Sequence, residues 1–216
     1  GPNGYTSTVE DPSGLAAGTY QATITDANGC STGLEVALLE PAPISATLTT
    51  SNFGGHGLSC NGGANGSITT QISGGNGPYG TTWSGPGGFS SSNADITNIP
   101  AGTYLLSITD AHGCTTTQSA TLTQPAALTA SPGGSSPVAC FGSNTGQATV
   151  AVAGGHPPYS YTWNTLPAQH AATATGLAAG NYTATLTDAN GCTASTTIAV
   201  GGPTQPLSAT VPSLDH

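Results

Sequence analysis

An internal repeat constrains this chain of 216 residues more than any other feature. A thirteen-residue phrase that begins Gly-Thr-Tyr or Gly-Asn-Tyr and ends in Gly-Cys occurs three times, at 18–30, 102–114 and 180–192. A second pattern places a Cys 23 residues before a Trp, at Cys60–Trp83 and again at Cys140–Trp163. Similarity to itself at a period of about 80 residues is the mark of a chain built from tandem copies of one folding unit.

The repeat divides the chain into domains. We predict that residues 1–43 are the C-terminal half of a truncated repeat, that 44–126 and 127–206 are complete repeats, and that 207–216 form the first strand of a following repeat. The chain is therefore expected to be a segment of a longer array. The joints between repeats are short and contain Pro, which makes them semi-rigid. We expect the repeats to line up end to end, each adding roughly 35–40 Å at the usual rise of a strand.

Each repeat is rich in strands. Tyr104, Leu106 and Ile108 alternate with small polar residues, and the other copies of the phrase have the same period of two. This alternation is typical of half-buried strands, and no stretch of ten residues has the spacing of a helix. Short strands separated by Gly and Pro turns indicate an all-β fold of tandem immunoglobulin-like β-sandwich domains, each of about 80 residues, arranged as an extended rod.

Aromatic residues recur at fixed positions and are predicted to form the structural core. The Tyr of the repeated phrase follows an apolar residue and a Gly, which resembles the tyrosine corner of such sandwiches, where the phenol hydroxyl bonds back to the chain. The Trp is expected on a central strand, although it could instead form a platform that stacks on sugars. The predicted core residues are Tyr20, Trp83, Tyr104, Trp163 and Tyr182.

One Asp recurs just before the Gly-Cys pair, at Asp26, Asp110 and Asp188. The Asn-Gly or His-Gly that follows it supplies the positive φ of a hairpin turn. The Asp is expected to accept backbone N–H bonds in that turn. The other interpretation is a Ca²⁺ ligand, but calcium takes several oxygens and each phrase offers one carboxylate. We therefore predict no cofactor and keep calcium as the one open possibility.

The five cysteines also follow the repeat. Each whole repeat owns two, so we predict the disulfides Cys60–Cys114 and Cys140–Cys192, with the partner of Cys30 upstream of this segment. A bond closing a loop of this length contributes roughly 4 kcal/mol in the chain-entropy model. The alternative is free buried thiols. A zinc site is not expected, because there is no C-x₂-C pair.

The charge balance excludes several functions. The chain has no Lys or Arg and nine acidic residues, a formal charge of −9, so it offers no basic patch for nucleic acid or anionic lipid. No run of 18 apolar residues predicts insertion into a membrane. A surface of low charge density tends to associate. We expect lateral association of copies into a filament. A second explanation of the absence of Lys and Arg is that it leaves no cleavage sites for trypsin-like proteases.

Catalytic motifs are missing from the sequence. It has no G-x-S-x-G nucleophile elbow, and the His residues lie in Gly-rich or turn contexts. No repeat holds its own set of base, nucleophile and orienting residue. We predict that the chain is not an enzyme and has no catalytic residues.

The ordered motifs Pro-Tyr-x-x-x-Trp, Leu-x-x-Gly-Thr-Tyr, Thr-Asp-Ala-Asn-Gly-Cys and Pro-Ala-x-Leu resemble the SprB-type repeat. This resemblance covers almost the whole chain. It implies a cell-surface adhesin of gliding or predatory Bacteroidota, secreted and built into long surface filaments. The expected function is a structural segment of an extracellular adhesin, with neighbouring repeats as partners. The alternatives are a glycan- or protein-binding module repeated along the stalk, or accessory repeats of a secreted enzyme.

Overall fold

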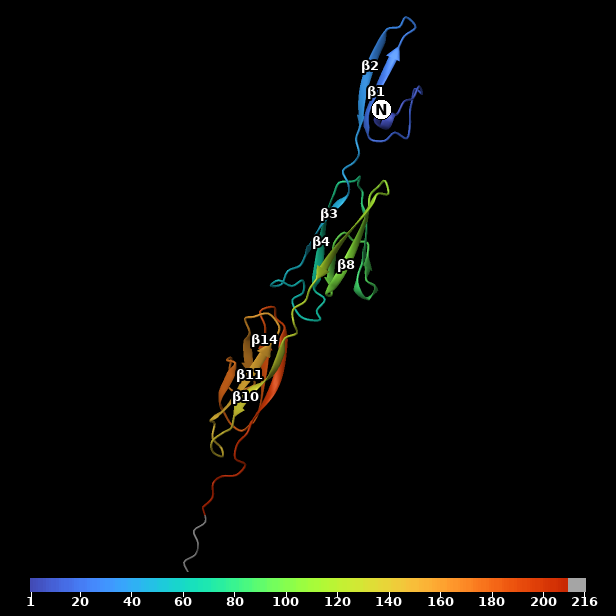
Figure 1. Ribbon diagram of the computed structural model, residues 1–216. Coiled ribbons are helices and arrows are strands. Elements are labelled where there is room, and N and C mark those ends of the chain that lie inside the picture. Colours follow the sequence, from blue (N-terminus) through green and yellow to red (C-terminus); the bar gives the residue numbers. More distant parts are fainter. Residues whose placement is uncertain (210–216) are drawn as a thin grey trace, which may run out of the picture. The chain divides into compact units, whose positions relative to one another are not determined.

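The computed structural model describes residues 1–209, and its regular structure consists of β-strands with two short 3₁₀ helices (Figure 1). The predicted strand at 207–216 lies outside the described residues except for 207–209, which belong to no strand. The helices are η1 (Pro2–Gly4) and η2 (Pro86–Gly88). The strands are β1 (Gly18–Thr25), β2 (Ser31–Leu38), β3 (Ser45–Thr50), β4 (Gly66–Ser73), β5 (Gly80–Ser84), β6 (Ser90–Ser91), β7 (Ile96–Ile99), β8 (Gly102–Thr109), β9 (Thr115–Leu122), β10 (Thr129–Ser136), β11 (Gly146–Ala153), β12 (Ser160–Trp163), β13 (Thr173–Leu177), β14 (Gly180–Thr187) and β15 (Thr193–Val200).

Two compact units make up the chain, and each is interleaved in sequence. The first unit comprises 1–46, 72–80 and 108–116, and the second comprises 47–71, 81–107 and the residues from 117 onward. This division does not follow the repeat boundaries, which stay a prediction. None of the helices in the described part of the chain is long and apolar enough to cross a membrane.

The copy at 127–206 is a sandwich of two antiparallel sheets. One sheet has the order β10-β11-β13 and the other the order β12-β14-β15. This is the arrangement of strands A, B and E against C, F and G in immunoglobulin-like domains. Apolar side chains of both sheets form one buried core, made by Val138, Ala148, Val150, Trp163, Ala174, Leu177, Ala184, Leu186, Ile198 and Val200. The all-β, immunoglobulin-like fold class is therefore confirmed.

The copy at 44–126 has the same strand order, with β3-β4-β7 in one sheet and β6-β5-β8-β9 in the other. The additional strand β6 pairs with β5 at Trp83 and Ser84. The two predicted core tryptophans, Trp83 and Trp163, are 0% and 1% exposed. Their indole N–H groups donate to the carbonyl oxygens of Ala94 and Ala171, respectively. A ring buried in this way cannot stack on a sugar, so the sugar-platform interpretation is wrong.

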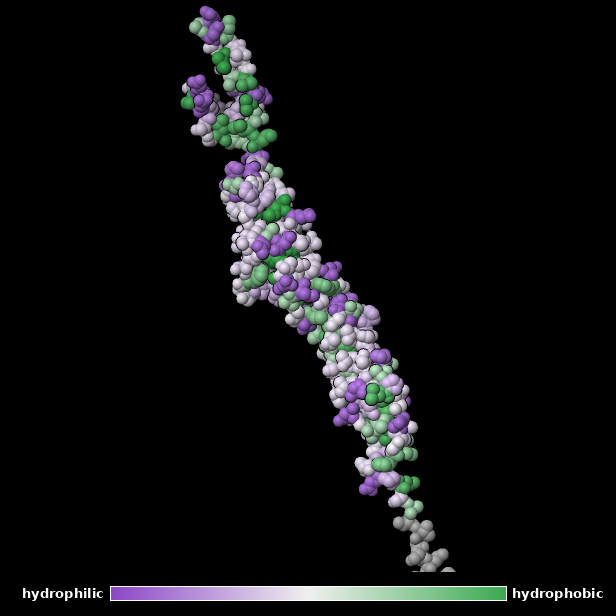
Figure 2. All heavy atoms as spheres, turned by 180° about the vertical axis from the view of Figure 1, so that it is seen from behind, coloured by the Kyte–Doolittle hydropathy of each residue, from purple (hydrophilic) through white to green (hydrophobic). Residues whose placement is uncertain are grey.

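The hairpin β1–β2 leaves its apolar side chains in solvent. Figure 2 shows hydrophobic residues gathered over this part of the chain, at the top of the view. Ile24 is 69% exposed, whereas its equivalent in the copy at 127–206, Leu186, is fully buried. Val36 and Leu38 are exposed in the same way. Among the described residues no second sheet covers this face.

The tyrosine corner is present in all three copies of the phrase. The hydroxyls of Tyr20, Tyr104 and Tyr182 donate to the carbonyl oxygen four residues upstream, at 2.8, 2.9 and 3.2 Å. The predicted bond back to the chain is therefore confirmed. Only Tyr104 is fully buried, while the other two are half-buried. Burial raises the pKa of Tyr104, which keeps its phenol protonated and able to donate.

Replacing Tyr104 by Phe should lower the free energy of unfolding by about 1 kcal/mol, the net contribution of one hydrogen bond. The ring and its edge-on contact with Phe89 would remain, so the loss reports the hydroxyl alone. Urea unfolding followed by tryptophan fluorescence measures it. Tyr182→Phe is the matched control, and its longer, more solvated bond predicts a smaller loss. Equal or larger destabilisation in the control would contradict this account.

Candidate functional site

The turn between β14 and β15 is a hairpin turn closed by its own backbone. The N–H of Gly191 donates to Asp188 O at 3.1 Å, and the N–H of Asp188 donates to Cys192 O at 2.9 Å. Gly191 has a φ of +83°, which a residue without Cβ adopts without strain. The equivalent glycines, Gly29 and Gly113, have φ of +86° and +83°. The hairpin turns predicted from Asn-Gly and His-Gly are therefore confirmed.

The carboxylate of Asp188 accepts three backbone hydrogen bonds at this turn. Its Oδ1 accepts from the backbone N–H groups of Asn190 and Cys192, and its Oδ2 accepts from His156 N–H, all at 2.9 Å. Asp110 makes the same three bonds, to Asn76, His112 and Cys114. The predicted role in the turn is confirmed for both residues.

The third copy of this residue, Asp26, accepts from Asn28 and Cys30 through Oδ1, so it also caps its turn. In the buried copies both carboxylate oxygens accept hydrogen bonds from backbone N–H groups. Among residues 1–209, no three His, Cys, Asp or Glu side chains gather where they could hold a metal.

These bonds set the pKa of the buried carboxyls. For Asp110 the N–H of Asn76 is the largest influence and lowers the pKa. For Asp188 burial is the largest influence and acts to raise the pKa, but the N–H groups of His156, Cys192 and Asn190 together outweigh it, so the pKa is lowered. Both groups are therefore anionic at neutral pH and stabilise the turn in that form.

Because its folded-state pKa is lowered, Asp188 stabilises the fold above the ordinary Asp pKa of about 3.9. That contribution is lost as the pH falls below this value and through the lower folded-state pKa. Asp188→Asn should cost roughly 1–3 kcal/mol at pH 7, since an amide cannot accept at both atoms. It should also flatten the acid limb of stability against pH. Thermal melts from pH 7 to pH 2 test this.

Asp11→Asn is the control, because it removes the same charge from an exposed site. This variant should keep both the stability and the acid limb of the parent chain. An acid limb that is unchanged in Asp188→Asn would contradict the role given to this carboxylate.

A disulfide joins this turn to the loop that follows β3. Cys60 and Cys192 are bonded, with 5.7 Å between their Cα atoms and 132 residues between them in sequence. Cys30, Cys114 and Cys140 are exposed and carry no disulfide. The predicted pairs Cys60–Cys114 and Cys140–Cys192 are therefore wrong. The bond connects one copy of the repeat to the next instead of closing a loop within a copy.

The length of β15 explains why the predicted pair is wrong. The N–H of Val138, two residues before Cys140, donates to Gly201 O at 2.9 Å, just beyond the end of β15. Cys192 lies just before the start of that strand. Eight residues of strand span roughly 26 Å. A disulfide requires Cα atoms within about 7 Å, so the two cysteines of this copy cannot meet.

Polar contacts surround the bond on the side of the loop. The side-chain amide of Asn190 donates to Ser59 O at 3.2 Å, and Sγ of Cys192 lies 3.3 Å from the same oxygen. The ring of His156 leaves no space for a side chain at Gly54, because a Cβ there would come within 2.3 Å of the imidazole. We call Ser59, Cys60, Asn190 and Cys192 the disulfide cluster.

The segment between the two copies is fixed to both of them. Asn61 donates its amide to Pro125 O at 2.9 Å, and Gly62 N–H donates to Gln124 Oε1 at 2.7 Å. On the other side, Gly155 N–H donates to Ala126 O at 2.9 Å. The sequence analysis missed this role of Gln124. A usable signal exists, because an amide or acid precedes Pro at every joint, in Glu40-Pro41, Gln124-Pro125 and Gln205-Pro206.

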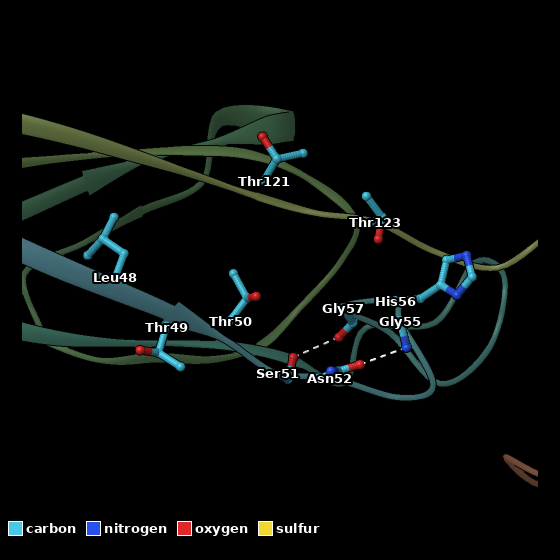
Figure 3. Close-up of a pocket in the computed structure, with 10 residues that line it drawn as sticks. All are labelled: Leu48, Thr49, Thr50, Ser51, Asn52, Gly55, His56, Gly57, Thr121 and Thr123. Carbon is cyan, nitrogen blue, oxygen red and sulfur yellow. Dashed lines mark hydrogen bonds between the residues drawn. The ribbon is translucent and has the colours of Figure 1, made fainter.

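A shallow groove of about 460 Å³ lies beside the loop that follows β3 (Figure 3). Hydroxyl-bearing residues form much of its wall, among them Thr50, Ser51 and Thr121. Some of its polar atoms already have partners within the protein. Ser51 donates to Gly57 O at 2.7 Å, and Asn52 accepts from Gly55 N–H at 2.7 Å. The groove is thus a polar surface hollow whose loop is held by its own hydrogen bonds.

Two segments of the chain, 58–88 and 134–168, match the family model of the SprB repeat. The segments lie at equivalent places, each running from the region of the loop Cys to the Trp or just beyond it. The predicted resemblance to this repeat family is therefore confirmed. No curated protein matches the chain.

Three solved structures are similar to this chain at low identity. The amphioxus IgVJ-C2 molecule is 17% identical, with 59% of this chain and 90% of that chain covered and a TM-score of 0.27. The C-terminal 282-residue fragment of intimin, solved with the intimin-binding domain of its translocated receptor, is 14% identical, with 85% and 57% covered and a TM-score of 0.33. The eight N-terminal domains of Down Syndrome Cell Adhesion Molecule are 17% identical, with 86% and 27% covered and a TM-score of 0.33.

Proposed function

We propose that this chain of SprB repeats is a structural segment of a long extracellular adhesin or surface filament that attaches cells to surfaces or to other cells. The observation that carries the proposal is the joint at Gln124–Ala126, which is hydrogen-bonded to both copies and spanned by a disulfide. A joint held in this way restricts the movement of the segment between the two copies, as a stalk under tension requires.

The disulfide and the composition support a location outside the cell. Disulfides persist in oxidising compartments such as the cell surface. Small sandwiches of Thr, Ser, Gly and Ala bury thin cores, so a covalent bond adds a large share of their stability. We therefore place the segment on the cell surface. From the resemblance to the SprB-type repeat, we also propose that the segment belongs to a surface filament of a gliding or predatory bacterium.

Antibody fragments raised against the chain test this function on intact cells that produce it. Gold-labelled fragments should mark structures that project from the cell surface, and the same fragments should reduce attachment of cells to glass. Fragments of equal size against an unrelated surface protein are the control. Labelling that appears only after the cells are permeabilised would overturn the proposal.

The second candidate is a module that binds glycans, and the polar groove beside Ser51 is the feature that favours it. A glycan array probed with the purified chain separates the two functions. Binding that is lost in Thr50→Val and Thr121→Val but kept in Thr185→Val, which changes an exposed residue of the other copy, would favour a binding module. No binding with normal surface labelling would favour the stalk.

Lateral association is the last part of the proposal. With no Lys or Arg, copies of the chain cannot form salt bridges with one another through those residues and must associate through hydrogen bonds and apolar contacts. Salt should therefore not weaken association, and by screening the repulsion between acidic copies it should favour association. Sedimentation at increasing concentration, in low and high salt, measures it. A chain that stays monomeric throughout would leave protease resistance as the better explanation of the composition.

A further inference from the structure

We infer that the cysteines of this array are bonded in a staggered series, in which the loop cysteine of each repeat bonds the hairpin cysteine of the repeat that follows. Cys60 and Cys192 are one such pair. In this series Cys140 pairs with the hairpin cysteine of the next repeat. Cys114 pairs with the loop cysteine of the preceding repeat, and Cys30 pairs likewise with a loop cysteine earlier in the array.

The two loop cysteines have the same local geometry. A turn of the same kind begins at each, since Gly63 N–H donates to Cys60 O at 3.2 Å and Ser143 N–H donates to Cys140 O at 3.0 Å. The residue two positions before each cysteine donates its backbone N–H to a carbonyl oxygen just beyond the last strand of the same copy. These bonds run from Leu58 to Thr123 and from Val138 to Gly201. Cys140 therefore lies in the same local backbone arrangement as Cys60, and its side chain is exposed.

The hairpin cysteines are also equivalent. The N–H groups of Cys30, Cys114 and Cys192 each donate to Oδ1 of the Asp four residues earlier, at 2.9 Å in every copy. Of these three residues, only Cys192 forms a disulfide in the structure, and its partner Cys60 lies in the preceding copy. Bonding within a copy is excluded by the length of β15 and, in the copy at 44–126, by the equal length of β9, so the staggered pairing is the one that accounts for all five cysteines.

Formation of each bond is an ordinary thiol–disulfide exchange. Two cysteine thiols lose two protons and two electrons as their S–S bond forms. The disulfide of a thiol oxidoreductase or of oxidised glutathione accepts these protons and electrons and is reduced to two thiols. The oxidant must act after both repeats have folded, since folding brings the two cysteines together. The exposed position of Cys140 and Cys114 keeps these thiols accessible until then.

The staggered series limits how far a loaded array can stretch. A covalent path along it crosses one disulfide, follows the chain from a hairpin cysteine to the next loop cysteine (30 residues from Cys30 to Cys60, 26 from Cys114 to Cys140), and crosses the next disulfide. It thereby covers two repeats with roughly 90–105 Å of fully extended chain. Folded, two repeats are expected to span roughly 70–80 Å. If the proposed function as a stalk holds, the filament can lengthen by only about a third even when its repeats unfold.

Peptide mapping of a lengthened chain tests the series. We would append a second copy of 127–206 after residue 206 and mark it with Ser195→Thr, an exposed position that shifts the mass of its hairpin peptide. Because the chain has no Lys or Arg, digestion would use enzymes that cut at Asp and at aromatic residues. We expect Cys140 to be bonded to the marked hairpin peptide. Cys140 as a free thiol, or bonded to a hairpin of its own copy, would overturn the inference.

Thiol counting in the chain as it stands is an independent test. Three cysteines are unpaired in the structure, and Cys60→Ser should raise the number of alkylated thiols to four. If Cys192 could reach Cys140 in its own copy, the same variant would show two. Neither result depends on attachment of cells, so failure of the series and failure of the proposed function are distinguishable.

Discussion

Replacing Trp163 by Ala is expected to lower the free energy of unfolding of the copy at 127–206 by roughly 3–5 kcal/mol, the usual cost of deleting a buried aromatic side chain. The ring is 1% exposed and lies in a core whose other members are mostly Ala, Val and Leu. Such small neighbours cannot close the resulting cavity. Since domains of this size are stable by only about 5–15 kcal/mol, the variant would be close to unfolding.

Urea unfolding followed by circular dichroism measures the loss, while the fluorescence of Trp83 reports the other copy. Thr162→Ala is the control, because it changes an exposed residue on the other face of the same strand. The milder Trp163→Phe should cost less and keeps the test informative if the Ala variant does not fold. A loss below 1 kcal/mol in the Ala variant would contradict the role of Trp163 in the core.

The second large effect is expected from Cys192→Ser, which removes the disulfide to Cys60. A bond between residues 132 apart restricts the unfolded chain strongly, and the chain-entropy model gives roughly 4–5 kcal/mol for such a loop. The variant should also release the hydrogen bond between Asn190 and Ser59, which the bond holds in place. Tryptophan fluorescence during urea unfolding would show a lower midpoint.

Cys140→Ser is the matched control for this measurement, since it changes the same residue type in the same copy at an unpaired, exposed site. It should leave the midpoint unchanged in the presence and absence of reductant. In contrast, reductant should convert the parent chain to the behaviour of Cys192→Ser. Equal midpoints for Cys192→Ser and the oxidised parent would show that the bond contributes nothing to stability.

Local chemistry made much of the fold predictable. The period of two along β14 identified a strand with a buried face, and Asn190-Gly191 identified the hairpin turn after it. The hydrogen bonds of the repeated Tyr and of Asp188 Oδ1 were predicted correctly, because they reach residues within a few positions in sequence. The bond from His156 to Asp188 Oδ2 spans 32 residues and was not predicted. Features of this kind depend on neighbours along the chain, and the repeat showed them in several copies.

The pairing of cysteines could not be obtained in that way. Two cysteines per repeat are consistent with bonds inside a repeat and with bonds from each repeat to the next, so counting them does not distinguish the two. What decides is the distance between Cys140 and Cys192, which β15 sets at several times the length of a disulfide. The sequence by itself determined the repeating unit, its strands and its turns. Only the tertiary structure decided which cysteine lies beside which, because that depends on where the ends of the strands meet in space.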